Sequence, residues 1–141
     1  MSVTNQQKVF LDTNLWVYLY SGNEPIKEAK INALVTQKFP NIVMSAQVLG
    51  EIYNVLSRKK LKPIDEIQLI IREQSNSFEI VSVTKEIVLK AFEIINKYKF
   101  SYWDSLIISA ALLAGCEILY SEDMHDEQII ESSLNVINPV L

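Results

Sequence analysis

Apolar residues along this chain follow two patterns, short continuous runs and longer stripes with helical spacing. Short runs between polar or turn residues are typical of buried strands, and stripes that recur every three to four residues are typical of helices. The runs predict strands at residues 8–11, 41–44, 78–83, 117–120 and 134–137. The stripes predict helices at residues 13–20, 25–38, 46–60, 64–74, 85–98, 102–114 and 127–132.

Polar and special residues mark where these helices begin and end. Ser45 and Thr84 stand directly before apolar stripes, where a hydroxyl can accept a hydrogen bond from a free backbone N–H. Pro25 fits the first turn of a helix, and Pro63 breaks the chain between two helices. Gly115 follows the last stripe residue of its helix, a common position for a left-handed stop.

Strands alternate with helices along the whole chain, which predicts an α/β fold. Short apolar strands of this kind favour a central parallel sheet of about five strands with helices on both faces. The chain has 141 residues without an internal repeat, low-complexity tract or linker, and this predicts a single domain over residues 1–141. In such sheets, ligands bind beyond the carboxyl ends of the strands.

Four acidic residues lie where an acid is least expected. Asp12 and Asp123 each follow an apolar strand, so both are expected at the carboxyl edge of the sheet. Glu51 shares the inward helix face of Val48, and Asp104 lies in the first turn of a nearly all-apolar helix. Converging carboxylates repel each other and are costly to desolvate, so together these residues predict a cation site.

Each acid also has an ordinary structural interpretation. Asp12 can cap the helix that follows it, and Asp104 can take part in a capping box that begins at Ser101. Glu51 can lie at the solvent edge of its stripe. Asp123 can be a turn residue, which leaves three candidates for the fourth acid of the site: Asp123, Glu122 and Asp126.

Other site chemistries have little support in the sequence. His125 is the only histidine and Cys116 the only cysteine, which argues against a structural zinc site and a Cys–His pair. The three glycines form neither a P-loop nor a dinucleotide fingerprint. Oxygen ligands alone favour Mg²⁺ or Mn²⁺.

The formal net charge of −4 is unfavourable for nucleic-acid binding, so such binding needs metal and local basic clusters. The main cluster is Arg58, Lys59 and Lys60, which either contacts RNA or is a solvated helix end. No apolar run is long enough to span a membrane, and residues 1–8 lack the apolar core of a signal peptide. These features predict a cytoplasmic protein.

Four segments together resemble the PIN-domain ribonucleases, especially the VapC-type toxins of toxin–antitoxin pairs. They are Phe10-Leu11-Asp12-Thr13-Asn14, Glu51 on its Ser45-capped helix, Tyr102-Trp103-Asp104-Ser105, and Leu119-Tyr120-Ser121-Glu122-Asp123-Met124. The resemblance extends from Lys8 to about Pro139 and implies a three-layer PIN-like fold. It identifies Asp12, Glu51, Asp104 and Asp123 as the acidic quartet, with Thr13, Asn14 and Ser121 as supporting polar residues. The glycine that related toxins often carry near position 127 is absent, since Glu127 stands there.

The resemblance implies a Mg²⁺- or Mn²⁺-dependent endoribonuclease. Asp12 and Asp104 would hold the principal ion, and Glu51 and Asp123 would complete the site directly or through water. It further implies an RNA substrate, a cognate antitoxin and a homodimer. The alternatives are a non-catalytic metal- or partner-binding protein and an aspartyl phosphatase, although Asn14 stands where that phosphatase chemistry needs a second Asp.

Overall fold

Six strands form one sheet in the structure, a computed structural model that describes residues 7–141. The strands are β1 (Val9–Leu11), β2 (Ile42–Ser45), β3 (Glu79–Val81), β4 (Ile118–Tyr120), β5 (Ile129–Ile130) and β6 (Leu134–Ile137). The helices are α1 (Thr13–Ser21), α2 (Pro25–Lys38), α3 (Ala46–Arg58), α4 (Ile64–Ser77), α5 (Lys85–Tyr98) and α6 (Tyr102–Leu113), with a 3₁₀ turn η1 (Phe39–Asn41).

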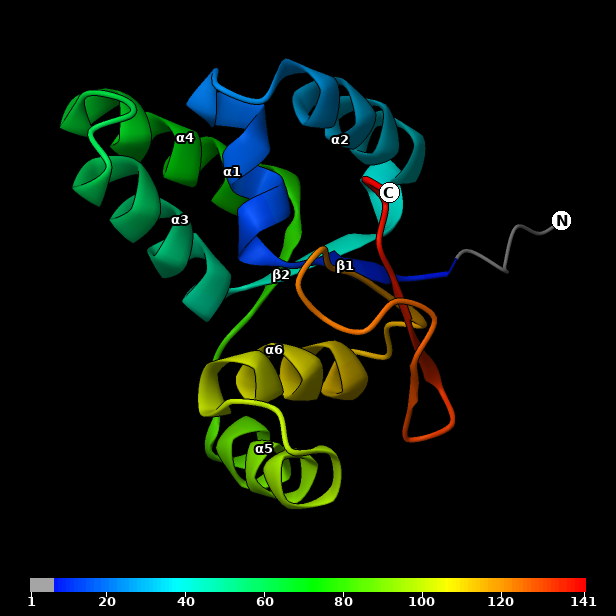
Figure 1. Ribbon diagram of the computed structural model, residues 1–141. Helices are drawn as coiled ribbons and strands as arrows, with labels where there is room; N and C mark the ends of the chain where they lie inside the picture. Colours follow the sequence, from blue (N-terminus) through cyan, green and yellow to red (C-terminus); the bar gives the residue numbers. More distant parts are fainter. Residues whose placement is uncertain (1–6) are drawn as a thin grey trace, which may run out of the picture.

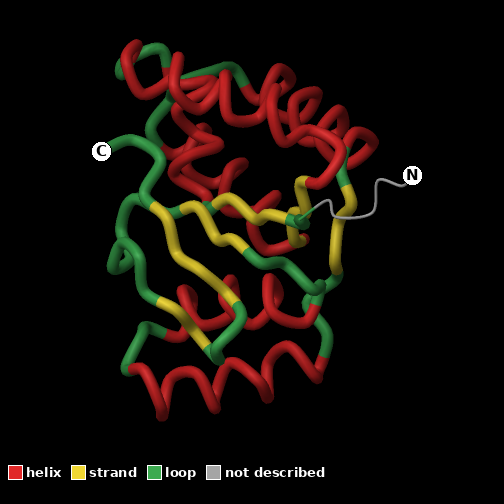
Figure 2. Tube along the Cα trace, turned by 90° about the vertical axis from the view of Figure 1, so that its right-hand side faces the viewer, coloured by secondary structure: helices red, strands yellow, loops and turns green. Residues whose placement is uncertain are grey.

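The elements form three layers, as the sequence predicts. Figure 2 shows the strands between two groups of helices. Helices α5 and α6 pack against each other on one face, while α1, α2, α3 and α4 form a connected group on the other face (Figure 1). The strands of the middle layer are therefore covered on both sides, which explains why β1 and β4 are apolar throughout.

The strand order is β3-β2-β1-β4-β6-β5. β1 pairs in parallel with both β2 and β4, with Phe10 opposite Val43 on one side and Leu119 on the other. Strands β2 and β3 lie on one side of β1, and β4, β6 and β5 lie on the other. The direction in which strands are added to the sheet therefore reverses between β1 and β4. A crevice at such a switch point, beyond the carboxyl ends of the strands, is the common ligand site of open α/β sheets.

The predicted helix starts are confirmed. The Ser45 hydroxyl accepts a hydrogen bond from the Val48 N–H at 3.3 Å and begins α3. The Thr84 hydroxyl likewise accepts from the Ile87 N–H at 3.2 Å and begins α5. These local signals fix the ends of the helices that flank the switch point.

The predicted helix at residues 127–132 is wrong. This segment contains β5, which pairs antiparallel with β6 and brings Ile130 opposite Leu134. Glu127, Glu131 and Ser132 have φ angles of 65°, 53° and 60°, which a right-handed helix cannot accommodate. Ile130 is fully buried while its neighbour Ile129 is 58% exposed, an alternation typical of a strand.

Within residues 7–141, none of the helices is both long and apolar enough to cross a bilayer. Most of the polar segment at residues 1–8, on which the prediction about a signal peptide rests, lies outside the described residues.

Candidate active site

A cavity of about 280 Å³ lies at the switch point, and all four predicted acids line it. Asp12 and its neighbours come from the start of α1, Glu51 from α3, Asp104 from the first turn of α6 and Asp123 from the loop after β4. The lining residues are Asp12, Thr13, Asn14, Glu51, Asn54, Val55, Asp104, Ile107 and Asp123. The structure thus brings together carboxylates that are up to 111 positions apart in the sequence, from Asp12 to Asp123.

Asp12 is the most buried of the four, with 7% of its surface exposed. One carboxylate oxygen accepts a hydrogen bond from the Thr13 N–H at 2.7 Å, which makes Asp12 the N-cap of α1. The other accepts from the Ser121 hydroxyl at 3.0 Å. Burial raises the pKa of Asp12 to about 6, which these two hydrogen bonds partly offset and the charges of Asp104 and Asp123 increase. Helix capping and a place in the cavity therefore coexist at this residue.

Asp104 combines the same two features. The Ser101 hydroxyl accepts a hydrogen bond from the Asp104 N–H at 3.1 Å and begins α6, which leaves the Asp104 side chain in the cavity. Burial raises the pKa of Asp104, and the charges of Asp123 and Glu51 add to this effect while Ser101 lowers it. Raised pKa values on two neighbouring carboxyl groups show that their negative charges are poorly compensated by the protein alone.

Two side chains fix the carboxylate of Glu51. The Thr13 hydroxyl donates a hydrogen bond to Oε1 of Glu51, and Nε2 of Gln47 donates to Oε2 at 3.0 Å. The same Gln47 nitrogen lies 3.3 Å from the backbone oxygen of Trp103, so it connects α3 to the start of α6.

The residues after β4 have three different environments. Asp123 lines the cavity and accepts a hydrogen bond from Nδ2 of Asn14 at 2.8 Å. Glu122 instead accepts hydrogen bonds from Lys27 and Tyr18. Asp126 accepts from the backbone N–H of Asn138 at 2.7 Å. Among the three candidates for the fourth acid, Asp123 is the one that the structure places with Asp12, Glu51 and Asp104.

Two further polar residues belong to this site and were not among the predicted ones. Gln47 and Asn54 lie four residues before and three residues after Glu51 on α3, so all three share one helix face. This spacing is the signal that would have identified them.

The donor set suits a small hard cation. Among residues 7–141, no three acidic, histidine or cysteine side chains surround a common point closely enough to enclose an ion by themselves. Mg²⁺ usually keeps several of its waters and is held by only one or two carboxylates, so a wide cavity with oxygen donors on its walls fits this ion better than a closed protein cage. The raised pKa values of Asp12 and Asp104 indicate a deficit of positive charge at the same place.

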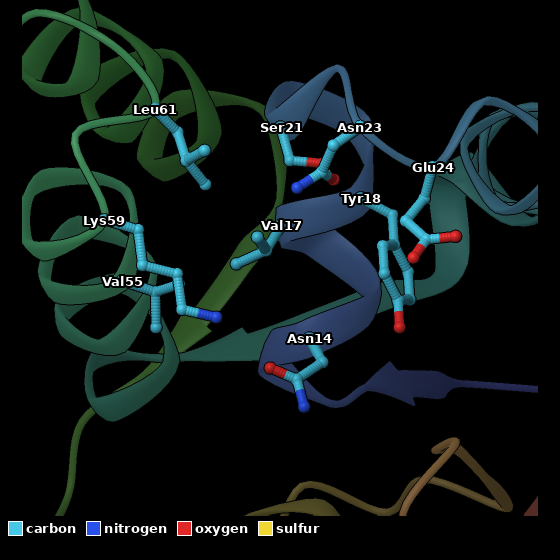
Figure 3. Close-up of a pocket in the computed structure, with 9 residues that line it drawn as sticks. All are labelled: Asn14, Val17, Tyr18, Ser21, Asn23, Glu24, Val55, Lys59 and Leu61. Carbon is cyan, nitrogen blue, oxygen red and sulfur yellow. The ribbon is translucent and has the colours of Figure 1, made fainter.

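A second cavity of about 250 Å³ adjoins the first and shares Asn14 and Val55 with it. Figure 3 shows the Lys59 amine reaching from the end of α3 toward α1, into the space next to Asn14. The described lining residues are Asn14, Val17, Tyr18, Ser21, Asn23, Glu24, Val55, Lys59 and Leu61. Of the predicted basic cluster, Lys59 is thus the member that lines this cavity, whereas Arg58 and Lys60 do not.

Comparisons with known proteins agree with this architecture. A family model described as PIN domain matches residues 9–128, and no curated protein matches the chain. Solved structures with this fold include VapC20 of Mycobacterium tuberculosis, a toxin that cleaves the sarcin–ricin loop, with 21% identity, a TM-score of 0.69, and coverage of 82% of this chain and 90% of that chain. A toxin–antitoxin complex from Klebsiella pneumoniae has 18% identity and a TM-score of 0.71, covering 94% of this chain and 98% of that one. VapBC2 of Rickettsia felis, bound to a DNA fragment from its promoter, has 20% identity and a TM-score of 0.69, covering 92% and 98%.

Proposed function

This chain belongs to the PIN-domain family, and we propose that it is a Mg²⁺- or Mn²⁺-dependent endoribonuclease that acts as the toxin of a toxin–antitoxin pair. The observation that carries the proposal is the convergence of four carboxylates from four separate segments in one cavity at the switch point of the sheet. The fold shared with VapC20 and with toxin–antitoxin complexes supports the same assignment.

Asp12 and Asp104 would hold the ion as its principal ligands, and Glu51 and Asp123 would complete the site directly or through water. When bound, such an ion would supply charge neutralisation at a phosphate and a water of lowered pKa for hydrolysis. The protein needs no nucleophile of its own for this reaction.

The three supporting polar residues each hold one carboxylate. Ser121 donates to Asp12, Asn14 to Asp123 and Thr13 to Glu51. Hydrogen bonds of this kind fix the orientation of a ligand before the metal arrives, and their loss commonly weakens metal affinity or activity. In this proposal the three residues therefore preorganise the acidic quartet.

The second cavity gives the RNA a path to the acids. Lys59 is the proposed phosphate contact, and Arg58 and Lys60 add positive charge near the end of α3. Because the chain carries a net charge of −4, this local charge matters more than the average charge of the protein.

The proposal includes a cognate antitoxin, a homodimer and a cytoplasmic location. Growth arrest on expression of this chain, relieved by coexpression of the neighbouring gene, would test the toxin–antitoxin assignment. Arrest that the neighbour does not relieve would contradict it.

The decisive experiment compares RNA 5′ ends after brief expression of wild type and Asp12→Asn. Replacing this carboxylate keeps its shape but removes the charge that a hard cation requires, so we expect cleavage to fall by about two orders of magnitude or more. Purified wild type with a chelator should lose activity in the same way. If metal-free Asp12→Asn cleaves RNA as well as wild type does, the metal-dependent mechanism is excluded. If wild type binds metal but does not cleave RNA, the chain is a non-catalytic binding protein.

A further inference from the structure

Trp103 is the most exposed aromatic residue among residues 7–141, with 61% of its surface accessible. It directly precedes Asp104, a lining residue of the acidic cavity, at the start of α6. A large apolar side chain gains nothing from this exposure in folding, since burial is what makes it stabilising. Its ring is therefore available to a ligand that reaches the neighbouring cavity.

The surroundings of Trp103 hold it in place. Its ring packs edge to face against the ring of Tyr102, with 5.0 Å between the ring centroids. The Tyr102 ring in turn packs against that of Phe92 on α5, with 6.3 Å between the centroids. Its backbone oxygen lies 3.3 Å from Nε2 of Gln47, which also binds Glu51. The Trp103 backbone and the Glu51 carboxylate are thus positioned by the same side chain.

Helix α3 connects this aromatic surface to the basic end of the site. Gln47 lies beside Trp103 in the first turn, Glu51 lines the acidic cavity, Val55 lines both cavities, and Lys59 follows the helix. Lys59 comes twelve positions after Gln47, which is about 18 Å along a helix. Figure 1 shows the start of α3 close to the start of α6, with the other end of α3 pointing away from it. Along α3, Glu51 therefore lies between the residue that contacts Trp103 and the lysine that lines the second cavity.

We infer that single-stranded RNA lies along α3, with a base on one side of the scissile phosphate stacked on Trp103 and a phosphate on the other side bound by Lys59. This inference rests on the proposed nuclease function and adds the direction of the substrate and the residue that positions it. Aromatic rings bind nucleobases of any sequence because every base has a flat π face. A substrate strand that passes Glu51 along α3 would meet Trp103 beside Gln47 on one side and Lys59 on the other.

The test measures RNA binding and cleavage separately. Binding of a short unstructured oligoribonucleotide is titrated in chelator, where the ion-dependent reaction cannot proceed, and is followed by tryptophan fluorescence. Trp103 is the responsive fluorophore, since Trp16, the other tryptophan, is 1% exposed. We expect RNA to quench the wild-type emission.

Two matched variants separate stacking from apolar bulk. Trp103→Leu keeps an apolar side chain in α6 but has no π face, so its affinity for RNA, measured by anisotropy of labelled RNA, should fall by about 5- to 100-fold. Trp103→Phe should retain most of the affinity. The salt dependence should stay as in wild type for both, whereas Lys59→Gln should flatten it. Leu113→Ala, at the other end of α6 and 53% exposed, is the control that should bind RNA as wild type does.

Three outcomes would overturn the inference: equal RNA affinity of Trp103→Leu and wild type, equal losses in Trp103→Leu and Leu113→Ala, or a change of oligomeric state in Trp103→Leu with RNA affinity intact. The last result would assign the ring to a contact between copies of the chain. Failure of the proposed function looks different, because wild type would then bind RNA through Trp103 and yet not cleave it with Mn²⁺.

Discussion

Asp12 shows how one side chain serves both the fold and the site. It caps α1, binds Ser121 across the switch point and lines the acidic cavity with 93% of its surface removed from solvent. Burial raises its pKa from the ordinary value of 3.8 to about 6, so folding disfavours the charged form. A bound cation would offset part of this cost.

The raised pKa of Asp12 predicts how stability depends on pH in chelator. Its favourable contribution is complete below about pH 4, where the carboxyl is protonated in both states, and is lost as the pH rises through about 6. Asp12→Asn stays neutral, so it should be more stable than wild type at pH 7.5 by up to about 3 kcal/mol and equally stable near pH 4. Urea unfolding of both proteins at the two pH values measures this difference. A wild type that is the more stable protein at pH 7.5 would show that the Asp12 carboxylate is already compensated.

Loss of charge at the neighbours Glu122 and Asp123 should affect different properties, stability at Glu122 and Mn²⁺ affinity at Asp123. Asp123→Asn removes an acid from the cavity, so Mn²⁺ affinity should fall, as measured by calorimetry. Glu122→Gln removes the partner of Lys27 and Tyr18, so it should lower stability by roughly 0.5–1 kcal/mol and leave Mn²⁺ affinity unchanged. The reverse ranking of Mn²⁺ affinities would make Glu122 the metal ligand.

The residues that could be predicted are those with a local signal. Asp12 and Asp123 follow strands, and Asp104 lies in the first turn of a capped helix, so strand ends and caps are enough to place them at one edge. The environment of Glu122 had no such signal, because its partner Lys27 lies 95 positions away and meets it only through tertiary packing.

At the scale of elements, the predictions succeeded where a helix has its own start signal and failed where a turn decides the structure. The predicted helix at residues 127–132 is part of a hairpin because three of its residues have positive φ. None of the three is a glycine, so the sequence carried no signal for this conformation. Ion pairs from Lys90 and Lys97 to Glu131 fix the hairpin against α5, which again is tertiary information. The capped helices α3 and α5, by contrast, begin where the sequence predicts.

Helix α3 carries a glycine that its fold does not require. Gly50 is an exposed residue inside the helix, and a methyl group added there would meet nothing within 4 Å. Gly50→Ala should therefore raise the free energy of unfolding by about 0.5–1 kcal/mol, measured in urea. Gly115→Ala is the matched control: Gly115 has a φ of +81°, so alanine there should destabilise. A destabilised Gly50→Ala would mean that α3 does not tolerate a side chain on this face.

At the scale of the whole molecule, negative charge is concentrated where the substrate would arrive. The chain carries a net charge of −4, and four carboxylates share one cavity beside an exposed tryptophan and a single lysine of the adjoining cavity. An anionic strand therefore binds such a site more weakly when no cation is bound. Metal binding, folding stability and RNA binding should therefore be linked in this protein.

That linkage predicts a reversal in thermal stability between wild type and Asp104→Asn. In chelator at pH 7, the variant should melt at the higher temperature, because burial and the charges of Asp123 and Glu51 disfavour the Asp104 carboxylate. With Mn²⁺ at a hundred times its Kd, wild type should gain about 2.7 kcal/mol, or a Tm rise of roughly 10 °C for a domain of this size. The variant should gain much less because it lacks a proposed ligand, so its advantage should disappear. Equal rises in Tm for the two proteins would show that Asp104 serves only the start of the helix. A Ser101→Ala variant removes the cap and leaves the Asp104 carboxylate. In that case it would lose the same stability with and without metal.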